Sequence, residues 1–135
     1  MTLTDTGPLV ALIDNRDGYH TKVKEIMKTV RFPLITTEAC LTETMHLLYA
    51  DGGWMAQASL WRLISSGALQ ITTAPEDAIE RVRVFMERFR DIPCDYADAT
   101  LLVAAEVIGQ RRIFTLDRHF YAYRLTDGSA LQVIE

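Results

Sequence analysis

The chain has 135 residues, of which 49% are hydrophobic and 24% charged, a balance typical of one soluble globular domain covering residues 1–135. Its formal net charge of −4 argues against a general nucleic-acid coat protein, but not against an enzyme that handles nucleic acid at one site. No apolar run reaches the roughly 18 residues that span a bilayer, and the N-terminus lacks the basic start of a secretory signal. We therefore expect a cytoplasmic protein without membrane contact, in which Cys40 and Cys94 are reduced, buried thiols.

The first half of the chain alternates short apolar runs with helical patterns. A strand is predicted at 2–4, and Thr6 with the following Gly-Pro is typical of a helix start, so a short helix is expected to reach residue 13. An amphipathic helix is predicted at 20–30 and a strand at 33–36. Thr37 is expected to cap a helix that ends near residue 50, before a separate helix at 54–65.

The second half continues the same alternation. It predicts a strand at 69–71, a helix opened by Pro75, a more apolar helix from 95 or 96 to 108, and strands at 113–116 and 131–134. Because helices separate the strands, the strands are expected to pair in parallel. The sequence thus predicts an α/β fold, with a mostly parallel sheet of about five short strands sandwiched between helices.

Acidic residues occur where such a sheet binds ligands, outside the carboxyl ends of its strands. Asp5 and Asp117 directly follow the first and fourth predicted strands. Glu43 lies on the helix after the second strand. Asp98 lies near the start of the helix before the fourth strand, on the same helix face as Asp95. Asp98 precedes an almost wholly apolar segment, where a carboxylate is costly unless it is paired or bound to metal.

These carboxylates admit two interpretations. Taken singly, each can be a helix cap or a surface charge that faces the positive end of a helix dipole. Taken together, four carboxylates at one sheet edge would repel one another strongly without a cation. Hard oxygen ligands suit Mg²⁺ or Mn²⁺, which keep coordinated waters and bind substrate phosphates. The pattern therefore indicates a divalent-metal site as well as the simpler alternative.

Four segments together resemble the successive motifs of PIN-domain proteins, especially the toxin ribonucleases of the VapC type. Order and spacing match over nearly the whole chain. The segments are Asp5-Thr6-Gly7-Pro8-Leu9-Val10-Ala11-Leu12, Thr37-Glu38-Ala39-Cys40-Leu41-Thr42-Glu43, Asp95-Tyr96-Ala97-Asp98-Ala99 and Phe114-Thr115-Leu116-Asp117-Arg118-His119-Phe120.

The resemblance implies metal-dependent cleavage of RNA phosphodiester bonds, with Mg²⁺ or Mn²⁺ as the cofactor. By motif, the catalytic acids fall on Asp5, Glu43, Asp98 and Asp117. Of these, Asp5, Asp98 and Asp117 are the expected metal ligands, with Asp117 and Glu43 binding directly or through water. Three auxiliary residues are expected: Thr6 and Thr115 would orient a carboxylate or a water, and Asp95 would be an additional ligand or an acid that supports a ligand.

The same resemblance implies the toxin half of a type II toxin–antitoxin pair, a homodimer inhibited by a small antitoxin that reaches the acidic pocket. The alternative is a non-catalytic PIN-type protein-binding module or a housekeeping RNA-processing nuclease. The segment with Trp54, Met55, Leu60 and Trp61 is either ordinary core or part of the dimer interface.

Rival chemistries find less support. Asp5-Thr6-Gly7 matches the aspartic-protease tripeptide, but those enzymes are rich in β-structure. A phosphoacceptor receiver domain needs a lysine near its last strand, and none follows Lys28. Glu43 and His46 have the spacing of a di-iron helix, which requires a second copy.

Two groups of basic residues can each be interpreted as surface residues or as contacts to RNA phosphates. His119 is a surface residue or a phosphate contact beside Asp117. A set of arginines on the helix opened by Pro75 is either a solvated face paired with Glu76, Glu80 and Glu87 or a track for the RNA backbone. The set is Arg81, Arg83, Arg88 and Arg90.

Overall fold

Five short strands form one sheet in the order β3–β2–β1–β4–β5, and every strand pair in it is parallel. The computed structural model describes residues 1–135. The strands are β1 (Thr2–Thr4), β2 (Leu34–Thr37), β3 (Leu69–Thr72), β4 (Arg112–Phe114) and β5 (Gln132–Ile134). The predicted α/β fold with a parallel sheet between helices is confirmed.

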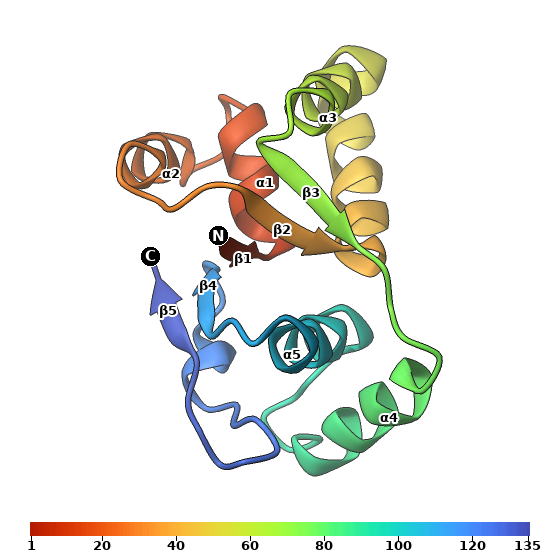
Figure 1. Cartoon of the computed structure of the whole chain (residues 1–135). Coiled ribbons are helices and arrows are strands. Elements are labelled where there is room, and N and C mark those ends of the chain that lie inside the picture. Colours follow the sequence, from red (N-terminus) through yellow and green to blue (C-terminus); the bar gives the residue numbers. More distant parts are fainter.

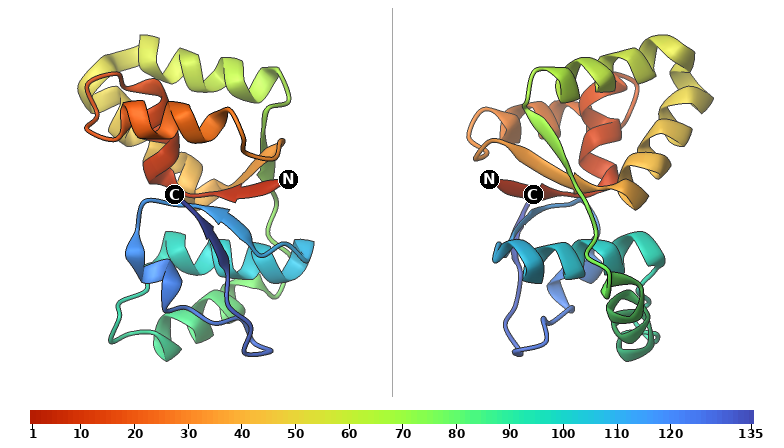
Figure 2. Two further views of the ribbon diagram at one scale, coloured as in Figure 1. Left: turned by 90° about the vertical axis from the view of Figure 1, so that its left-hand side faces the viewer. Right: turned by 45° about the vertical axis from the view of Figure 1, so that its right-hand side comes forward.

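Helices cover both faces of this sheet (Figures 1 and 2). One layer holds α1 (Thr6–Ile13), α2 (His20–Met27) and α3 (Glu38–Ser65). The other holds α4 (Ala78–Arg88) and α5 (Tyr96–Ile108), with the short 3₁₀ helix η1 (Arg118–Tyr121) beside them. No helix combines the length and apolarity that crossing a membrane requires.

Each face of the sheet has its own hydrophobic core. On the side of α1–α3, Leu9, Leu48 and Phe114 are among the fully buried side chains. On the other side, α5 buries nearly its whole length, because its apolar residues occupy both the sheet-facing and the α4-facing surfaces. Both Cys40 and Cys94 are free and buried, as predicted. Burial raises the pKa of each thiol to about 12, so neither is a reactive thiolate.

The two helices predicted up to about residue 50 and at 54–65 are present as the two segments of α3, which meet at a kink at Gly53 (Figure 1). Gly53 has φ 59° and ψ −155°, a left-handed backbone conformation that glycine adopts at little cost. Gly53 therefore ends the first helical segment, and the second segment begins directly after it without an intervening loop.

Several predicted boundaries are corrected by the structure. Asp5, and not Thr6, is the N-cap of α1, and its side chain accepts a hydrogen bond from the Thr6 backbone N–H. The helix after Pro75 begins at Ala78, because Pro75 lies in a turn whose carbonyl accepts the Ala78 N–H. Helix α2 ends at Met27, about one turn before the predicted residue 30.

The predicted caps of α3 and α5 are confirmed: Thr37 accepts from the Cys40 N–H, and Gly109 ends α5 with φ 72°. Strand β4 ends at Phe114, so Asp117 does not follow it directly as predicted. Asp117 instead caps η1, a helix that the sequence pattern did not reveal.

Candidate active site

The order of the strands reverses around β1, which lies between β2 and β4. At such a point the connections leave to opposite sides of the sheet, and the carboxyl ends of the central strands border an open crevice. A pocket of about 310 Å³ occupies this place. It is lined by Asp5, Thr6, Gly7, Glu43, Leu47, Asp95, Asp98, Leu116 and Asp117. All four predicted catalytic acids therefore border the same pocket.

Asp5 is fixed at the end of β1 by hydrogen bonds to both carboxylate oxygens. Its Oδ1 accepts the Thr6 N–H at 2.8 Å, and its Oδ2 accepts the Thr115 hydroxyl at 2.8 Å. The Thr115 Oγ1 in turn accepts the Asp117 N–H at 3.0 Å. Thr115 thus connects two of the acids. The Thr6 hydroxyl lies 3.4 Å from the Cys40 carbonyl, so Thr6 orients Asp5 through its backbone and not through its side chain.

Asp98 occupies the first turn of α5, where it forms a capping box with Asp95. The Asp95 Oδ1 accepts the Asp98 N–H at 2.8 Å, and the Asp98 Oδ2 accepts the Asp95 N–H at 3.3 Å. The simpler interpretation of Asp95 as a helix cap is therefore correct. Asp98 is a capping residue as well, yet only its Oδ2 is used for that purpose.

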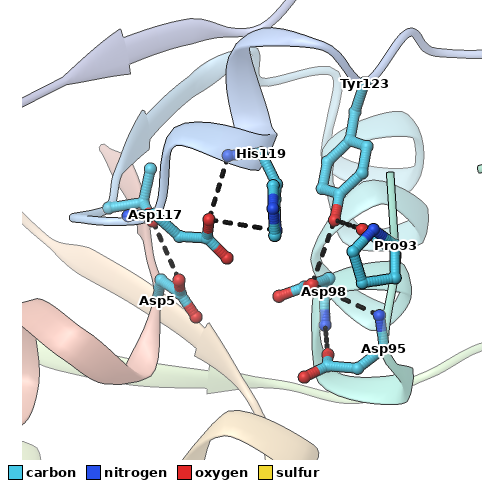
Figure 3. A network of polar contacts seen from close by, with 8 residues as sticks. Asp5, Pro93, Asp95, Asp98, Asp117, His119 and Tyr123 are labelled. Carbon is cyan, nitrogen blue, oxygen red and sulfur yellow. Dashed lines mark hydrogen bonds and ion pairs between the residues drawn. The ribbon is translucent and has the colours of Figure 1, made fainter. Parts of the chain in front are cut away.

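A residue absent from the sequence-based site, Tyr123, also contacts Asp98 (Figure 3). Its hydroxyl lies 3.1 Å from Asp98 Oδ2 and 2.6 Å from the Pro93 carbonyl oxygen. Burial and the nearby Asp98 charge raise the pKa of Tyr123 above its ordinary value, so the phenol keeps the proton that it donates. The signal in the sequence was weak: Phe120 and Tyr123 stand three residues apart in an otherwise polar stretch.

The other two acids are more open to solvent. Glu43 is exposed on α3 and has no hydrogen-bond partner in the protein. Asp117 accepts the His119 backbone N–H at 2.9 Å, and the His119 Nδ1 lies 3.3 Å from the same Oδ1 (Figure 3). The structure thus places His119 against Asp117 at the pocket rim, while His119 itself stays exposed.

The pocket is electrostatically strained by its own carboxylates. Burial, opposed by the Thr115 and Thr6 hydrogen bonds, raises the pKa of Asp5 to about 6, with the charges of Asp117 and Glu43 adding to the rise. Burial and the charges of Asp95 and Asp5 raise the pKa of Asp98 to about 7. The pKa of Glu43 is raised for the same two reasons, burial and the charge of Asp95. No cationic side chain pairs with Asp5, Glu43 or Asp98.

This donor set fits a hard divalent cation. The pocket offers only carboxylate and hydroxyl oxygens at its polar positions, and these repel one another until a cation arrives. No three acidic, histidine or cysteine side chains form a ready-made cluster for a metal. Such an open arrangement suits Mg²⁺, which keeps several waters and takes only one or two carboxylates from the protein. The assignment of Asp5, Asp98 and Asp117 as ligands stays a prediction.

Two of the four arginines, Arg81 and Arg83, are paired with carboxylates, whereas Arg88 and Arg90 have no carboxylate partner. Arg83 pairs with Glu80 and Glu87 on the same helix, as the solvated-face interpretation predicts. Arg81 pairs with Glu106 of α5 instead, at 3.0 Å. The Arg88 guanidinium lies over the Phe85 and Phe89 rings.

Comparisons with known proteins agree with this geometry. A family model described as the PIN domain matches residues 2–125. Ribonuclease VapC26 of Mycobacterium tuberculosis is 28% identical over 133 residues, covering 98% of each protein. The crystal structure of Mycobacterium tuberculosis VapC20, described as a sarcin–ricin loop cleaving toxin, superposes with a TM-score of 0.79 at 20% identity, over 87% of this chain and 90% of that one.

A toxin–antitoxin complex from Klebsiella pneumoniae gives a TM-score of 0.71 at 17% identity, over 100% of this chain and 97% of that one. At these identities the two structures bear on the fold, which they share with this chain.

Proposed function

Because the chain belongs to the PIN domain family, we propose that it is a Mg²⁺- or Mn²⁺-dependent endoribonuclease, the toxin of a toxin–antitoxin pair acting in the cytoplasm. The observation that carries the proposal is the pocket at the ends of β1 and β4, where four carboxylates meet and no lysine or arginine pairs with any of them. They are Asp5, Glu43, Asp98 and Asp117. The VapC relatives support the same activity.

The residues divide the work by position. Asp5, whose two oxygens both accept hydrogen bonds from the protein, and Asp98, whose Oδ1 is free, would hold the cation. When bound, Mg²⁺ or Mn²⁺ supplies neutralisation of the phosphodiester charge and makes water more acidic. Glu43 has no partner in the protein and sits at the rim, so it can accept a hydrogen bond from a water and direct it toward phosphorus. Thr115 keeps Asp5 and the Asp117 backbone in register.

The test is cleavage of a mixed RNA pool by pure protein with Mg²⁺ or Mn²⁺, beside the Asp5→Asn variant. Asp77→Asn is the matched control, because Asp77 is exposed, lies outside the pocket and makes no side-chain hydrogen bond. We expect metal-stimulated cleavage by the wild type and the control and almost none by Asp5→Asn. Wild-type protein that binds the metal but leaves every RNA intact would favour the non-catalytic binding module.

The homodimer is a second part of the proposal, supported by the exposed side chains of the second half of α3. Trp54 and Trp61, seven residues apart, share one helix face and are 60% and 47% exposed; Met55 beside them is 71% exposed. Large aromatic and Met side chains are enriched in interface cores. Leu60 does not contribute, because it is fully buried in the core.

An antitoxin is the third part. The pocket concentrates negative charge, and the half-exposed Leu47 borders it, which offers a basic residue and an apolar neighbour a combined docking place. An arginine from a partner would pair with the carboxylates through charge-assisted hydrogen bonds and compete with the cation. The toxin–antitoxin complex with the same fold supports such a partner.

A further inference from the structure

Tyr123 differs from the other tyrosines of the chain in its surroundings. Its side chain is completely buried, whereas Tyr19, Tyr49, Tyr96 and Tyr121 are all about half exposed or more. The Tyr123 ring packs against Phe89, with ring centroids 5.3 Å apart, and edge-on against Phe120 at 5.0 Å. These two contacts fix the plane of the ring and hence the position of its hydroxyl.

The hydroxyl reaches the acidic pocket from behind Asp98. The single proton of the hydroxyl is shared between two acceptors, the Pro93 carbonyl oxygen at 2.6 Å and Asp98 Oδ2 at 3.1 Å, and Asp98 Oδ2 also accepts the Asp95 N–H. Both donors therefore use the same oxygen of Asp98, and the other oxygen, Oδ1, accepts no hydrogen bond from the protein. Figure 3 shows this free oxygen pointing away from Tyr123, toward the side where Asp5 and Asp117 lie.

We propose that Tyr123 is a positioning residue of the cleavage site: its hydroxyl holds Asp98 Oδ2 so that Asp98 Oδ1 is presented to the divalent cation. The inference rests on the proposed function. A carboxylate fixed by an outer hydrogen bond loses less rotational freedom when it binds a metal, and removal of such an outer partner typically weakens metal binding by about 10–100-fold.

The chain also links Tyr123 to the opposite wall of the pocket. Asp117 caps η1, and Tyr123 follows the end of that helix, with Phe120 between them in the core. The short segment from Asp117 to Tyr123 therefore places the Asp117 carboxylate on one side of the pocket and the Tyr123 hydroxyl against Asp98 on the other side. A shift of this segment would move both walls together.

The variant Tyr123→Phe tests the inference, because it keeps the ring and its packing and removes only the hydroxyl. We expect Mn²⁺ affinity, measured by calorimetry on the full chain, to fall by about 10-fold. We expect kcat to fall similarly while KM for RNA stays unchanged, since the hydroxyl does not face the substrate. Tyr121→Phe, which removes an exposed hydroxyl nearby, should change neither quantity.

A purely structural role predicts a different result: a lower melting temperature with unchanged Mn²⁺ affinity and kcat, and that outcome would overturn the inference. If the wild type binds Mn²⁺ and cleaves RNA, and Tyr123→Phe is equally active, the inference is wrong but the proposed function stands. Wild-type protein that neither binds Mn²⁺ nor cleaves RNA would overturn the proposed function, and the inference with it.

A measurement on the wild type covers the case in which Tyr123→Phe does not fold. In protein labelled with ¹³C at tyrosine Cζ, the buried Tyr123 signal should shift on addition of Mg²⁺, with the midpoint that calorimetry of the wild type with Mg²⁺ gives. The signal of Tyr19, on the opposite side of the sheet at the start of α2, should stay in place. A Tyr123 chemical shift that does not change at saturating Mg²⁺ would contradict the proposed contact.

Discussion

The Thr115 hydroxyl donates to Asp5 Oδ2 at 2.8 Å although the two residues are 110 positions apart in the sequence. The register of the sheet explains this contact. Thr4 of β1 pairs with Phe114 of β4, so the next residue of each strand, Asp5 and Thr115, leaves the sheet side by side. The same Thr115 oxygen accepts the Asp117 N–H, which places two acids around one hydroxyl.

The variant Thr115→Val should therefore reduce cleavage by about 10–100-fold, because it removes the donor that fixes Asp5 and the acceptor of the Asp117 N–H. The hydroxyl also lowers the pKa of Asp5, so its loss should move the pH at which activity appears upward. The measurement is the cleavage rate between pH 5.5 and 8.5 at fixed Mn²⁺.

Two variants control for the loss of a buried hydroxyl as such. Thr36→Val removes a buried hydroxyl that donates to the Thr4 carbonyl within the sheet, outside the pocket, and should lower stability with little effect on activity. Thr115→Ser keeps the hydroxyl and should keep most of the activity. Equal losses in Thr115→Val and Thr36→Val would show that Thr115 has no special role at the site.

Much of this arrangement could be predicted from local sequence signals. Asp5, Glu43 and Asp98 were placed on their elements by strand and helix periodicity, and parallel pairing brings those elements to one edge. The limits are equally specific. Periodicity could not show η1, because a helix of four residues is too short to reveal a helical period.

Tertiary contacts explain what the sequence left out. Tyr123 lies in a stretch with no helical or strand period, and its role depends on Pro93 and Asp98, far from it in the chain. The side chain of Thr6 was predicted to orient an acid or a water, but its hydroxyl points to the Cys40 carbonyl. Such partners are set by how helices pack, which no local pattern encodes.

The variant Asp98→Asn should lower cleavage by orders of magnitude while the fold persists. The amide oxygen can still accept the Asp95 N–H and maintain the capping box, but the negative charge at the pocket is lost. Asp77→Asn is the matched control, because Asp77 is the N-cap of α4, lies outside the pocket, and asparagine caps helices as well as aspartate does. Circular dichroism checks the fold and RNA cleavage checks the activity. Full metal-dependent activity in pure Asp98→Asn protein would show that Asp98 is not a ligand of the cation.

Metal-free protein should lose stability as the pH rises from 5 to 8. The folded-state pKa values of Asp5 and Asp98, about 6 and about 7, lie above the value of 3.8 for an unperturbed aspartate. The folded state therefore binds more protons than the unfolded state in this window, and the stability present at low pH is lost as each group ionises. For Asp5 alone, the loss between pH 5 and pH 8 is about 1.4 kcal/mol, because only the one pH unit from 5 to about 6 contributes in this window.

Urea unfolding in the presence of EDTA at pH 5 and pH 8 measures this loss. Carboxylates with lowered pKa, such as Glu106, titrate below this window and do not disturb it. The variant Asp98→Asn should flatten the pH dependence, whereas Mn²⁺ should reverse it, because protons and metal compete for the same oxygens. A metal-free wild type that is more stable at pH 8 than at pH 5 would contradict the strained pocket.

The variant Asp117→Asn should leave the stability of metal-free protein unchanged or raise it. The negative charges of Asp117 and Asp5 repel each other, and the substitution removes this repulsion. The asparagine oxygen can still cap η1 by accepting the His119 N–H. Mn²⁺ should raise the melting temperature of the wild type by linkage, and raise that of the variant less. Thermal melts with and without millimolar Mn²⁺ decide the matter. If the wild type shows no shift, the pocket does not bind the metal.

The variant Trp61→Glu should convert the proposed homodimer into a monomer. Trp61 shares an exposed apolar face of α3 with Trp54, and a carboxylate at the centre of a buried interface is costly when it finds no partner. The fold should survive, because Trp61 is 47% exposed and α3 keeps its buried face through Leu48 and Leu60. Light scattering at micromolar concentration gives the mass of both proteins.

Ile79→Glu is the matched control for this variant. Ile79 is an exposed apolar residue of α4, on the other side of the sheet, and the same change there should leave the dimer intact. A wild type that stays monomeric on concentration rejects the dimer altogether. A folded Trp61→Glu protein of dimeric mass beside a monomeric Ile79→Glu protein would move the interface to α4, since each substitution introduces the same charge and differs only in the helix that carries it.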